Sequence, residues 1–497
     1  MRYPSGVYRP SLALLTDLYQ LTMAHAHWRR GLDPEQEAIF HLFFRRLPFG
    51  GGFAIACGLD GALDYLQHLR FEPDDLAYLE TLEGTDGAPL FEPAFLERLG
   101  RFRFRCDVDA LPEGTVVFAQ EPLLRVVGPI FDAQIVETAL LNLINYPTLV
   151  ATKAARLRLA AAGDPVVEFG LRRAQGPDGA LTAARAAAIG GCEGTSNLQA
   201  GRAFGLPVRG THAHAWVLAF DSELEAFRAY AEAQPGNCVL LVDTFDSLEG
   251  VRRAVEVGRE LAAKGVALAG IRLDSGDLAW LSGEARRILD EAGLVETKIL
   301  ASNDLDEHLI ESLRQQGAKI DVWCVGTRLV TAFDDPALGG VYKLAAVRRG
   351  DGAWEPRLKL SEQAVKTTTP GLLQVRRFSD DRGFVADMIY DELLGIAGTH
   401  EIVDPMDPTR RRRLHAKMTS EDLLRRVVTG GEVVAEPVAI ATARARAQEQ
   451  VERLHPGVLR FLNPHAYPVG LELGLHERKT ALVLAAREAS SGGRRDD

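Results

Sequence analysis

Residues 238–265 read CVLLVDTFDSLEGVRRAVEVGRELAAKG, an apolar run, an acidic residue and then an amphipathic stretch. The apolar run predicts a buried strand that ends at Asp243. The stretch from about Leu248 predicts a helix, because its apolar residues recur three and four positions apart. The same plan recurs at spacings of roughly thirty residues, at 267–293, 298–317 and 320–330. This repeat is typical of βα units in a parallel sheet.

Two upstream segments, 166–171 and 207–215, predict further strands and bring the total to at least six. That number favours a closed or nearly closed barrel over an open sheet. We therefore expect an α/β fold: an irregular β/α (TIM-like) barrel flanked by an α/β domain built from both terminal segments. The expected limits are an N-terminal α/β domain, the barrel, a C-terminal segment packing on the N-terminal domain and a disordered tail, at 1–135, 136–345, 346–487 and 488–497.

Composition restricts the class of protein. The chain has 497 residues, of which 46% are hydrophobic and 25% are charged, so it can bury a large core. It has no apolar run of about 18 residues and no export pattern at its N-terminus, so we expect no membrane association. The five cysteines are scattered and form no CxxC pair, which fits a cytoplasmic protein. A net charge of −11 argues against nucleic-acid binding, and the run 410–413 is interpreted as a solvated loop.

Polar side chains follow the predicted strands. In β/α barrels ligands bind at the carboxyl ends of the strands, so these positions are the candidate site. They are Arg172, Arg173, His212, His214, Asp243, Arg272, Asp274, Asn303, Gly326 and Thr327.

His212 and His214 are two residues apart, so on a strand they would share a face. They could bind a metal together, one could act as a nucleophile or general base, or one could pack in the core while the other bonds a backbone carbonyl. The later strands offer aspartate, serine, asparagine, arginine and glycine. A metal hydrolase is therefore a minor alternative.

The segment RLDSGD places Arg272 beside two carboxylates. Asp274 and Asp277 could hold a sugar diol or Mg²⁺, while the guanidinium could grip a carboxylate or phosphate. Alternatively, one aspartate caps the following helix. Gly326 leaves backbone N–H groups open to phosphate.

Three other segments carry specific expectations. Only one of Arg172 and Arg173 should face inward if both lie on a strand. The glycine-rich stretch 190–201 predicts a turn into a helix capped by Thr195 or Ser196. A helix near 14–30, capped by Thr16 or Asp17, would leave Tyr19 off its apolar stripe, either as surface packing or as a contact that stacks on an aromatic ligand.

Taken together, these segments closely resemble the nicotinate phosphoribosyltransferases, which are type II phosphoribosyltransferases. The matching segments run in order from Leu14 to Leu344: LLTDLYQLTM, FHLFFRR, EFGLRRAQGPDG, GGCEGTSN, GTHAHAW, LLVDTFD, RLDSGD, SNDLDE and GGVYKL. A weaker similarity continues through KLSE and LNPHAYPV. No single segment is specific, but the ordered combination is.

The resemblance implies an enzyme that joins nicotinate to 5-phosphoribosyl-1-pyrophosphate with Mg²⁺, releasing pyrophosphate and nicotinate mononucleotide in NAD salvage. It also implies ATP as a co-substrate, consumed through a transient phosphohistidine that matches His214, and a homodimer. Tyr19, Thr211 and Arg272 match the nicotinate site. Asp243 and Asp274 would act in catalysis, with Asp274 and Asp277 as candidate Mg²⁺ ligands. The phosphoribosyl substrate would contact Thr327, Gly326, Arg172, Arg173 and Asn303.

Alternatives are a related enzyme that uses nicotinamide or quinolinate and a catalytically silent binder of phosphoribosyl ligands. Nicotinamide has no carboxylate for Arg272 to bind, whereas quinolinate would need a second cationic clamp.

Overall fold

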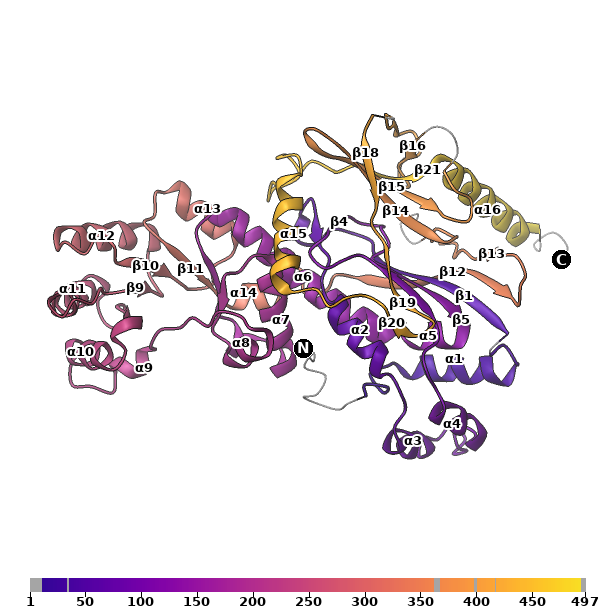
Figure 1. Cartoon of the computed structure of the whole chain (residues 1–497), viewed down its shortest axis with the longest axis horizontal. Coiled ribbons are helices and arrows are strands. Elements are labelled where there is room, and N and C mark those ends of the chain that lie inside the picture. Colours follow the sequence, from indigo (N-terminus) through magenta and orange to yellow (C-terminus); the bar gives the residue numbers. More distant parts are fainter. Residues whose placement is uncertain (1–10, 34, 362–366, 397–399, 416, 493–497) are drawn as a thin grey trace. The chain divides into compact units, whose positions relative to one another are not determined.

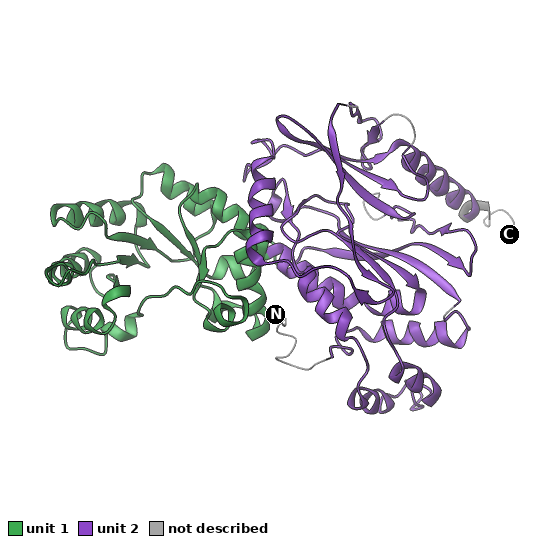
Figure 2. Cartoon of the chain, viewed as in Figure 1, with its two compact units in different colours: residues 1, 150–336 green, residues 2–149, 337–497 purple. Residues whose placement is uncertain are grey.

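The computed structural model describes residues 11–33, 35–361, 367–396, 400–415 and 417–492. They form two compact units (Figure 2). Unit 1 comprises residues 150–336, and unit 2 comprises the described parts of 2–149 and 337–497. The division into domains expected from the sequence stays a prediction.

Unit 1 is built on a six-stranded parallel sheet in the order β7-β6-β11-β10-β9-β8 (Figure 1). Its strands are β6 (Val166–Glu168), β7 (Gly194–Thr195), β8 (Val239–Leu241), β9 (Gly270–Leu273), β10 (Lys298–Ala301) and β11 (Val322–Val325). Most of their residues are buried, as expected for a parallel sheet covered on both faces. The predicted repeat of strand and helix is therefore confirmed across 238–330.

Helices connect these strands. They are α7 (Gly176–Gly190), α8 (Leu198–Phe204), α9 (His214–Val217), α10 (Glu223–Ala233), α11 (Ser247–Ala263), α12 (Leu278–Glu291), α13 (Glu307–Gln315) and α14 (Thr327–Val330), with the 3₁₀ turns η3 (Leu171–Arg173) and η4 (Pro235–Asn237). Aspartates cap three of them: Asp246, Asp277 and Asp306 accept backbone N–H groups of α11, α12 and α13. The cap on α8 is Asn197, not Thr195 or Ser196, because its side chain accepts the Ala200 N–H at 3.1 Å.

The sheet of unit 1 is not closed by strand pairing among the described residues. β7 and β8 are its two edges, so the expected closed barrel is not found. The predicted strand at 207–215 is also wrong, since only Val208 forms a backbone bridge, to Thr195. Beyond the Arg209 N–H, which still bonds Thr195 O, residues 210–213 form no strand, and His214 already begins α9. His212 and His214 therefore do not share the face of a strand.

Unit 2 contains two large sheets and a small one, β2-β4. The first has the order β13-β12-β1-β5-β3-β19-β20 and the second β17-β16-β21-β15-β14-β18. Their strands are β1 (Gln36–Phe44), β2 (Ala54–Ile55), β3 (Asp107–Ala110), β4 (Val116–Val117), β5 (Leu124–Pro129), β12 (Gly340–Arg349), β13 (Glu355–Pro356), β14 (Leu373–Asp380), β15 (Gly383–Asp391), β16 (Glu401–Val403), β17 (Arg411–Arg413), β18 (Thr419–Asp422), β19 (Arg425–Thr429), β20 (Glu432–Val433) and β21 (Val469–Glu472).

Segments from both ends of the chain share the first sheet, since β1 pairs with β5 and with β12. The helices are α1 (Leu18–Arg29), α2 (Leu59–His68), α3 (Pro73–Glu80), α4 (Pro93–Gly100), α5 (Ile130–Ile135), α15 (Ile440–Glu452) and α16 (Leu473–Gly492), while α6 (Glu137–Ala161) runs through the limit between the units.

Three details of unit 2 differ from the sequence-based expectations. Residues 411–413 form the edge strand β17, paired with β16, and are not a loop. Asp17 occupies the N-cap position of α1 without a capping hydrogen bond, because its carboxylate accepts the Thr138 hydroxyl instead. The backbone of α16 continues through Gly492, and residues 493–497 of the expected tail lie outside the described residues. None of the described helices combines the length and the apolar character needed to span a bilayer.

A close approach of helix to strand fixes α11 against β8. A Cβ atom at Gly250 would overlap the carbonyl oxygen of Val242, so only glycine fits there. We predict that Gly250→Ala destabilises the protein by about 1–3 kcal/mol through overpacking. Gly283→Ala on α12 is the matched control, since no atom lies within 4 Å of its added Cβ, and it should stabilise by up to about 1 kcal/mol. Thermal unfolding of both variants checks this, and equal midpoints would contradict it.

Candidate active site

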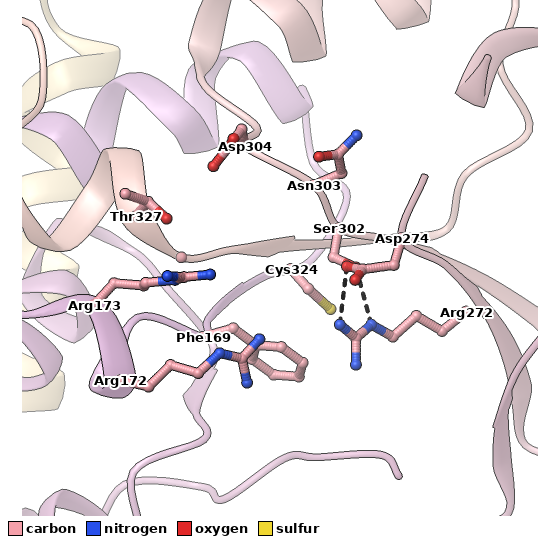
Figure 3. Close-up of a pocket in the computed structure, with 11 residues that line it drawn as sticks. Phe169, Arg172, Arg173, Arg272, Asp274, Ser302, Asn303, Asp304, Cys324 and Thr327 are labelled. Carbon is pink, nitrogen blue, oxygen red and sulfur yellow. Dashed lines mark hydrogen bonds and ion pairs between the residues drawn. The ribbon is translucent and has the colours of Figure 1, made fainter. Parts of the chain in front are cut away.

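An open cavity of about 170 Å³ lies at the carboxyl ends of β6, β9, β10 and β11 in unit 1 (Figure 3). The last residues of these strands and the residues that follow them form its lining: Phe169, Arg172, Arg173, Arg272, Asp274, Ser302, Asn303, Asp304, Cys324, Gly326 and Thr327. Of the polar strand-end residues predicted to meet at one place, this lining contains Arg172, Arg173, Arg272, Asp274, Asn303, Gly326 and Thr327.

Arg272 is the most constrained side chain of the cavity. It is 7% exposed and donates three hydrogen bonds to side chains, of which those to Ser302 and Asp274 lie within Figure 3. Its Nε donates to Ser302 Oγ at 2.9 Å, its Nη1 to Thr211 Oγ1 at 2.9 Å and its Nη2 to Asp274 Oδ1 at 3.0 Å. The guanidinium also lies 5.7 Å from the centre of the Phe169 ring. A guanidinium has five N–H donors, so one donor remains on each terminal nitrogen.

Two carboxylates stand next to this arginine. Burial raises the pKa of Asp274, but its bond from Ser302 and the charge and bond of Arg272 outweigh burial, so the pKa lies below its ordinary value. Asp243 Oδ2 accepts the Asp274 N–H at 2.9 Å and the Ser275 hydroxyl at 2.6 Å. Asp243 Oδ1 is buried and has no hydrogen-bond partner among the described residues. Such an orphaned oxygen is typical of a site that awaits a ligand.

Arg172 and Arg173 both line the cavity, so the expectation that only one faces inward is wrong. They lie on the 3₁₀ turn η3 and not on a strand, so neighbouring side chains need not point to opposite faces. Both are exposed, and neither forms an ion pair within the part of the chain that the structure describes. Figure 3 shows the two side chains extending into the same cavity. The cavity therefore carries two cations without protein counter-ions.

Contacts with neighbouring residues fix the loop that follows β10 and the segment that follows β11. Asn303 and Asp304 have positive φ angles of 98° and 42°, a conformation that the neighbouring structure must enforce. Arg328, next to Thr327, lies 3.5 Å from Asp306 and 3.4 Å from Asp334. This arginine therefore joins the loop that follows β10 to the segment that follows β11.

Helix α6 contributes two buried cations to this region. The wholly buried Lys153 forms ion pairs with Glu307 at 2.8 Å and with Asp334. Arg156 of α6 bonds the other oxygen of Glu307 at 2.7 Å. The N-terminus of α13, and with it the preceding loop, is therefore tied to α6 by buried ion pairs.

The two histidines have different surroundings. His214 is half-exposed; its Nδ1 lies 3.2 Å from Thr244 Oγ1 and its Nε2 3.8 Å from Asp274 Oδ2. His212 is buried, and its Nε2 accepts the Leu241 N–H at 3.1 Å. His212 therefore fills a structural position, while His214 faces the cavity's carboxylate.

The remaining predicted residues lie in several places. Thr211, His214 and Asp243 do not line the cavity but bond or face residues that do. Asp277 is exposed and caps α12, which bears out the capping alternative; its role as a Mg²⁺ ligand stays a prediction. No group of three or more His, Cys, Asp or Glu residues suited to a metal occurs among the described residues. Tyr19 lies in unit 2, 48% exposed, and its role stays a prediction.

The predicted site residues did not include Phe169, Ser302, Asp304 and Cys324. Ser302 and Asp304 flank Asn303 just after a predicted strand, so their positions carried the same signal as Asn303. Phe169 lies within the predicted strand 166–171, where an aromatic residue is typical of a buried strand. Cys324 gave no such signal, because it lies within an apolar strand, and burial raises its pKa to about 12.

Models of one family match three parts of the chain: the nicotinate phosphoribosyltransferase N-terminal domain at 14–145, the family domain at 165–348 and the C-terminal domain at 374–479. The nicotinate phosphoribosyltransferase of Bacillus subtilis is 42% identical over 94% of both chains. The chain belongs to the nicotinate phosphoribosyltransferase family.

Other family members agree with this assignment. The human nicotinate phosphoribosyltransferase is 36% identical and covers 95% of this chain and 96% of its own length. The crystal structure of human nicotinic acid phosphoribosyltransferase matches with a TM-score of 0.82 and 33% identity, covering 94% of this chain and 99% of that one. The family's α/β fold is therefore shared over nearly the whole chain.

Burial lowers the pKa of His212 from 6.5 to about 4, and the charge of Arg272 acts in the same direction. The groups near this ring are Arg272 of β9, Tyr230 of α10 and His214 of its own segment. A proton therefore binds residue 212 at pH 5 in the unfolded chain but not in the folded one. The contribution of neutral His212 to the free energy of unfolding is fully present above pH 6.5 and is lost as the pH falls toward 4.

We predict that His212→Gln takes up about one proton fewer than the parent chain on thermal unfolding at pH 5, since the amide cannot titrate. Calorimetry in two buffers of different ionisation enthalpy measures this uptake. Equal proton uptake in the two proteins would show that His212 is already charged in the fold.

Proposed function

We propose that this chain transfers the phosphoribosyl group of 5-phosphoribosyl-1-pyrophosphate to nicotinate, giving nicotinate mononucleotide and pyrophosphate, the first step of NAD salvage from nicotinic acid. The observation that carries the proposal is the arrangement of Arg272, a buried cation held on three sides with two donors left over. The names of its relatives and the match of the family models support the same activity.

The two free donors of Arg272 suit a carboxylate. One N–H remains on each terminal nitrogen, and a carboxylate accepts from such a pair with two parallel bonds. The hydroxyl groups of Thr211 and Ser302 donate to His212 O and to Asp274, so they offer only lone pairs to the arginine. The ion pair with Asp274 offsets part of the guanidinium charge, and the rest of this charge and the two free N–H groups would serve a ligand. Nicotinamide lacks the negative charge that would match it.

The neighbouring Phe169 supplies an apolar surface for a pyridine ring. It lies beside the guanidinium and lines the same cavity. An aromatic ligand that stacks on Phe169 would place its carboxylate toward Arg272. Ring and charge together define an aromatic acid as the acceptor substrate.

The other side of the cavity suits a phosphorylated sugar. Arg172 and Arg173 extend into it without protein counter-ions, and Thr327 and Gly326 present a hydroxyl and backbone N–H groups. Asn303 adds an amide at the same rim. In the reaction the pyridine nitrogen bonds to C1 of the ribose as the C1–pyrophosphate bond breaks, and pyrophosphate leaves with the electron pair. The two arginines would stabilise that charge.

The carboxylates Asp243 and Asp274 fit the opposite charge that develops on the ribose. They also fit a Mg²⁺ ion, because the buried Asp243 Oδ1 lacks a partner and Mg²⁺ prefers one or two carboxylates together with substrate phosphates. Asp277 would be a more distant contributor. When bound, the ion would neutralise part of the pyrophosphate charge.

We also infer that ATP is consumed through His214. A ring nitrogen of His214 would attack the γ-phosphorus of ATP, the bond to the bridging oxygen would break and ADP would leave. Water would later hydrolyse the N–P bond, releasing phosphate and restoring the imidazole. Supporting this, His214 is half-exposed, Thr244 contacts one ring nitrogen and Asp274 faces the other. This coupling would make the enzyme an ATP-dependent ligase.

The homodimer stays a proposal. Three apolar side chains of α1 are exposed, namely Leu18, Tyr19 and Met23. A second copy of the chain would bury this surface, and the ring of Tyr19 would then be available to a neighbouring site.

The first prediction concerns Arg272. Arg272→Ala should raise the KM for nicotinate at least about 10-fold, since a hydrogen bond to a charged group contributes about 1.5–3 kcal/mol. It should also reduce the preference for nicotinate over nicotinamide. Steady-state kinetics with both acceptors measures this.

The control is Arg287→Ala, which removes an exposed arginine of α12 that pairs with Glu284 and Glu291. Its KM for nicotinate should equal that of the parent chain. A nicotinate KM in Arg272→Ala close to the parent value would overturn the assignment of the acceptor site.

The second prediction concerns His214. His214→Ala should abolish the stimulation of pyrophosphate release by ATP while a slow ATP-independent transfer remains, because Arg272 and the cavity are unchanged. His68→Ala is the control, since its side chain has the same exposed fraction, 42%, but lies on α2 of unit 2. ATP stimulation that survives in His214→Ala would exclude this residue as the phosphoryl acceptor.

A further inference from the structure

The open edge of β8 has one backbone donor that a side chain satisfies. β8 pairs with β9 on one side only, and it is an edge of the sheet. The Leu241 N–H donates to His212 Nε2 at 3.1 Å. His212 thus takes the place of a strand neighbour at this position, where an unpaired buried N–H would be unfavourable.

The segment that carries His212 is bonded to the opposite edge as well. Thr195 of β7 donates to Pro207 O at 3.0 Å and accepts the Arg209 N–H at 2.9 Å. Arg209 and His212 are three residues apart, and an extended chain spans at most about 3.3–3.6 Å per residue. Residues 207–212 therefore form a short connection between the two edges of the sheet, here called the edge bridge.

Two residues close to His212 in the chain contact different groups of the site. Thr211 accepts the Arg272 Nη1 bond at 2.9 Å. His214, two residues after His212, lies near Asp274 and Thr244. The position of the edge bridge therefore determines the positions of both Thr211 and His214.

Packing and hydrogen bonds hold the His212 ring in one orientation. It packs edge-on against Tyr230 with ring centroids 4.9 Å apart, and Phe227 lies 6.0 Å away. Because Nε2 accepts a hydrogen bond, the proton is on Nδ1, which lies 3.4 Å from Ala213 O. A neutral imidazole in this tautomer satisfies both contacts.

We propose that His212 is a positioning residue that couples the two halves of the site by holding the edge bridge on β8. Its bond to Leu241 sets Thr211 against Arg272 and His214 against Asp274 at the same time. Loss of this bond weakens nicotinate binding and ATP coupling together, whereas a change at Thr211 acts directly on the Arg272 side and a change at His214 acts directly on the phosphoryl side. The kinetic part of this proposal rests on the proposed function; the structural part does not.

Two variants of the full-length protein separate the bond from the packing. His212→Phe keeps an aromatic ring against Tyr230 but removes the acceptor. His212→Gln keeps an acceptor at similar reach. The structural readout is hydrogen–deuterium exchange at the Leu241 amide, which needs no substrate. We expect exchange at least about 10-fold faster in His212→Phe and close to the parent rate in His212→Gln.

The kinetic readout is the KM for nicotinate and the factor by which ATP stimulates pyrophosphate release. In His212→Phe we expect the KM to rise several-fold and the ATP stimulation to fall by a similar factor, with both restored in His212→Gln. Faster exchange with both kinetic values unchanged would reduce His212 to a structural residue and overturn the proposal. Unchanged exchange at Leu241 would overturn it as well.

Failure of the proposed function gives a different result. In that case the parent chain itself would not turn over nicotinate, while the exchange at Leu241 would still report on the edge bridge.

Discussion

The site depends on the fixed position of one buried cation, Arg272. Its neighbours come from three separate segments: Thr211 from the edge bridge, Asp274 from the end of its own strand and Ser302 from the end of β10. A buried arginine with only one partner would carry a large desolvation cost, but three acceptors satisfy it and fix its plane. In the proposed function, the two donors that remain would bind the ligand without further rearrangement. Pre-organisation of this kind favours a planar anion over a neutral amide of the same shape.

In the proposed function, the same arrangement would link recognition to catalysis. Asp274 accepts from Arg272 and also faces His214, so one carboxylate would serve both the acceptor side and the phosphoryl side of the site. Its pKa lies below the ordinary value, which keeps it charged at neutral pH. Negative charge introduced at His214 would therefore be felt by Asp274 and, through it, by Arg272. This provides a physical route by which ATP consumption would influence nicotinate binding.

The sequence predicted the regular parts of unit 1 well and the irregular parts poorly. The apolar strands and amphipathic helices of 238–330 follow from periodicity, because each must bury one face. The run 207–215 looks like another strand, yet its single partner is Thr195, and long-range pairing is not encoded in local pattern. The expectation that only one of Arg172 and Arg173 faces inward assumed the alternation of a strand, whereas a 3₁₀ turn lets both enter the cavity. Two of the three bonds of Arg272, to Thr211 and Ser302, were not predictable, because they join residues 61 and 30 positions apart.

The most direct test is pyrophosphate release by the parent chain with 5-phosphoribosyl-1-pyrophosphate and Mg²⁺, comparing nicotinate with nicotinamide, each with and without ATP. We predict turnover of nicotinate, stimulated by ATP, and little turnover of nicotinamide, since only nicotinate carries the charge that Arg272 is held to bind. A preference for nicotinamide, or no turnover of either, would contradict the account.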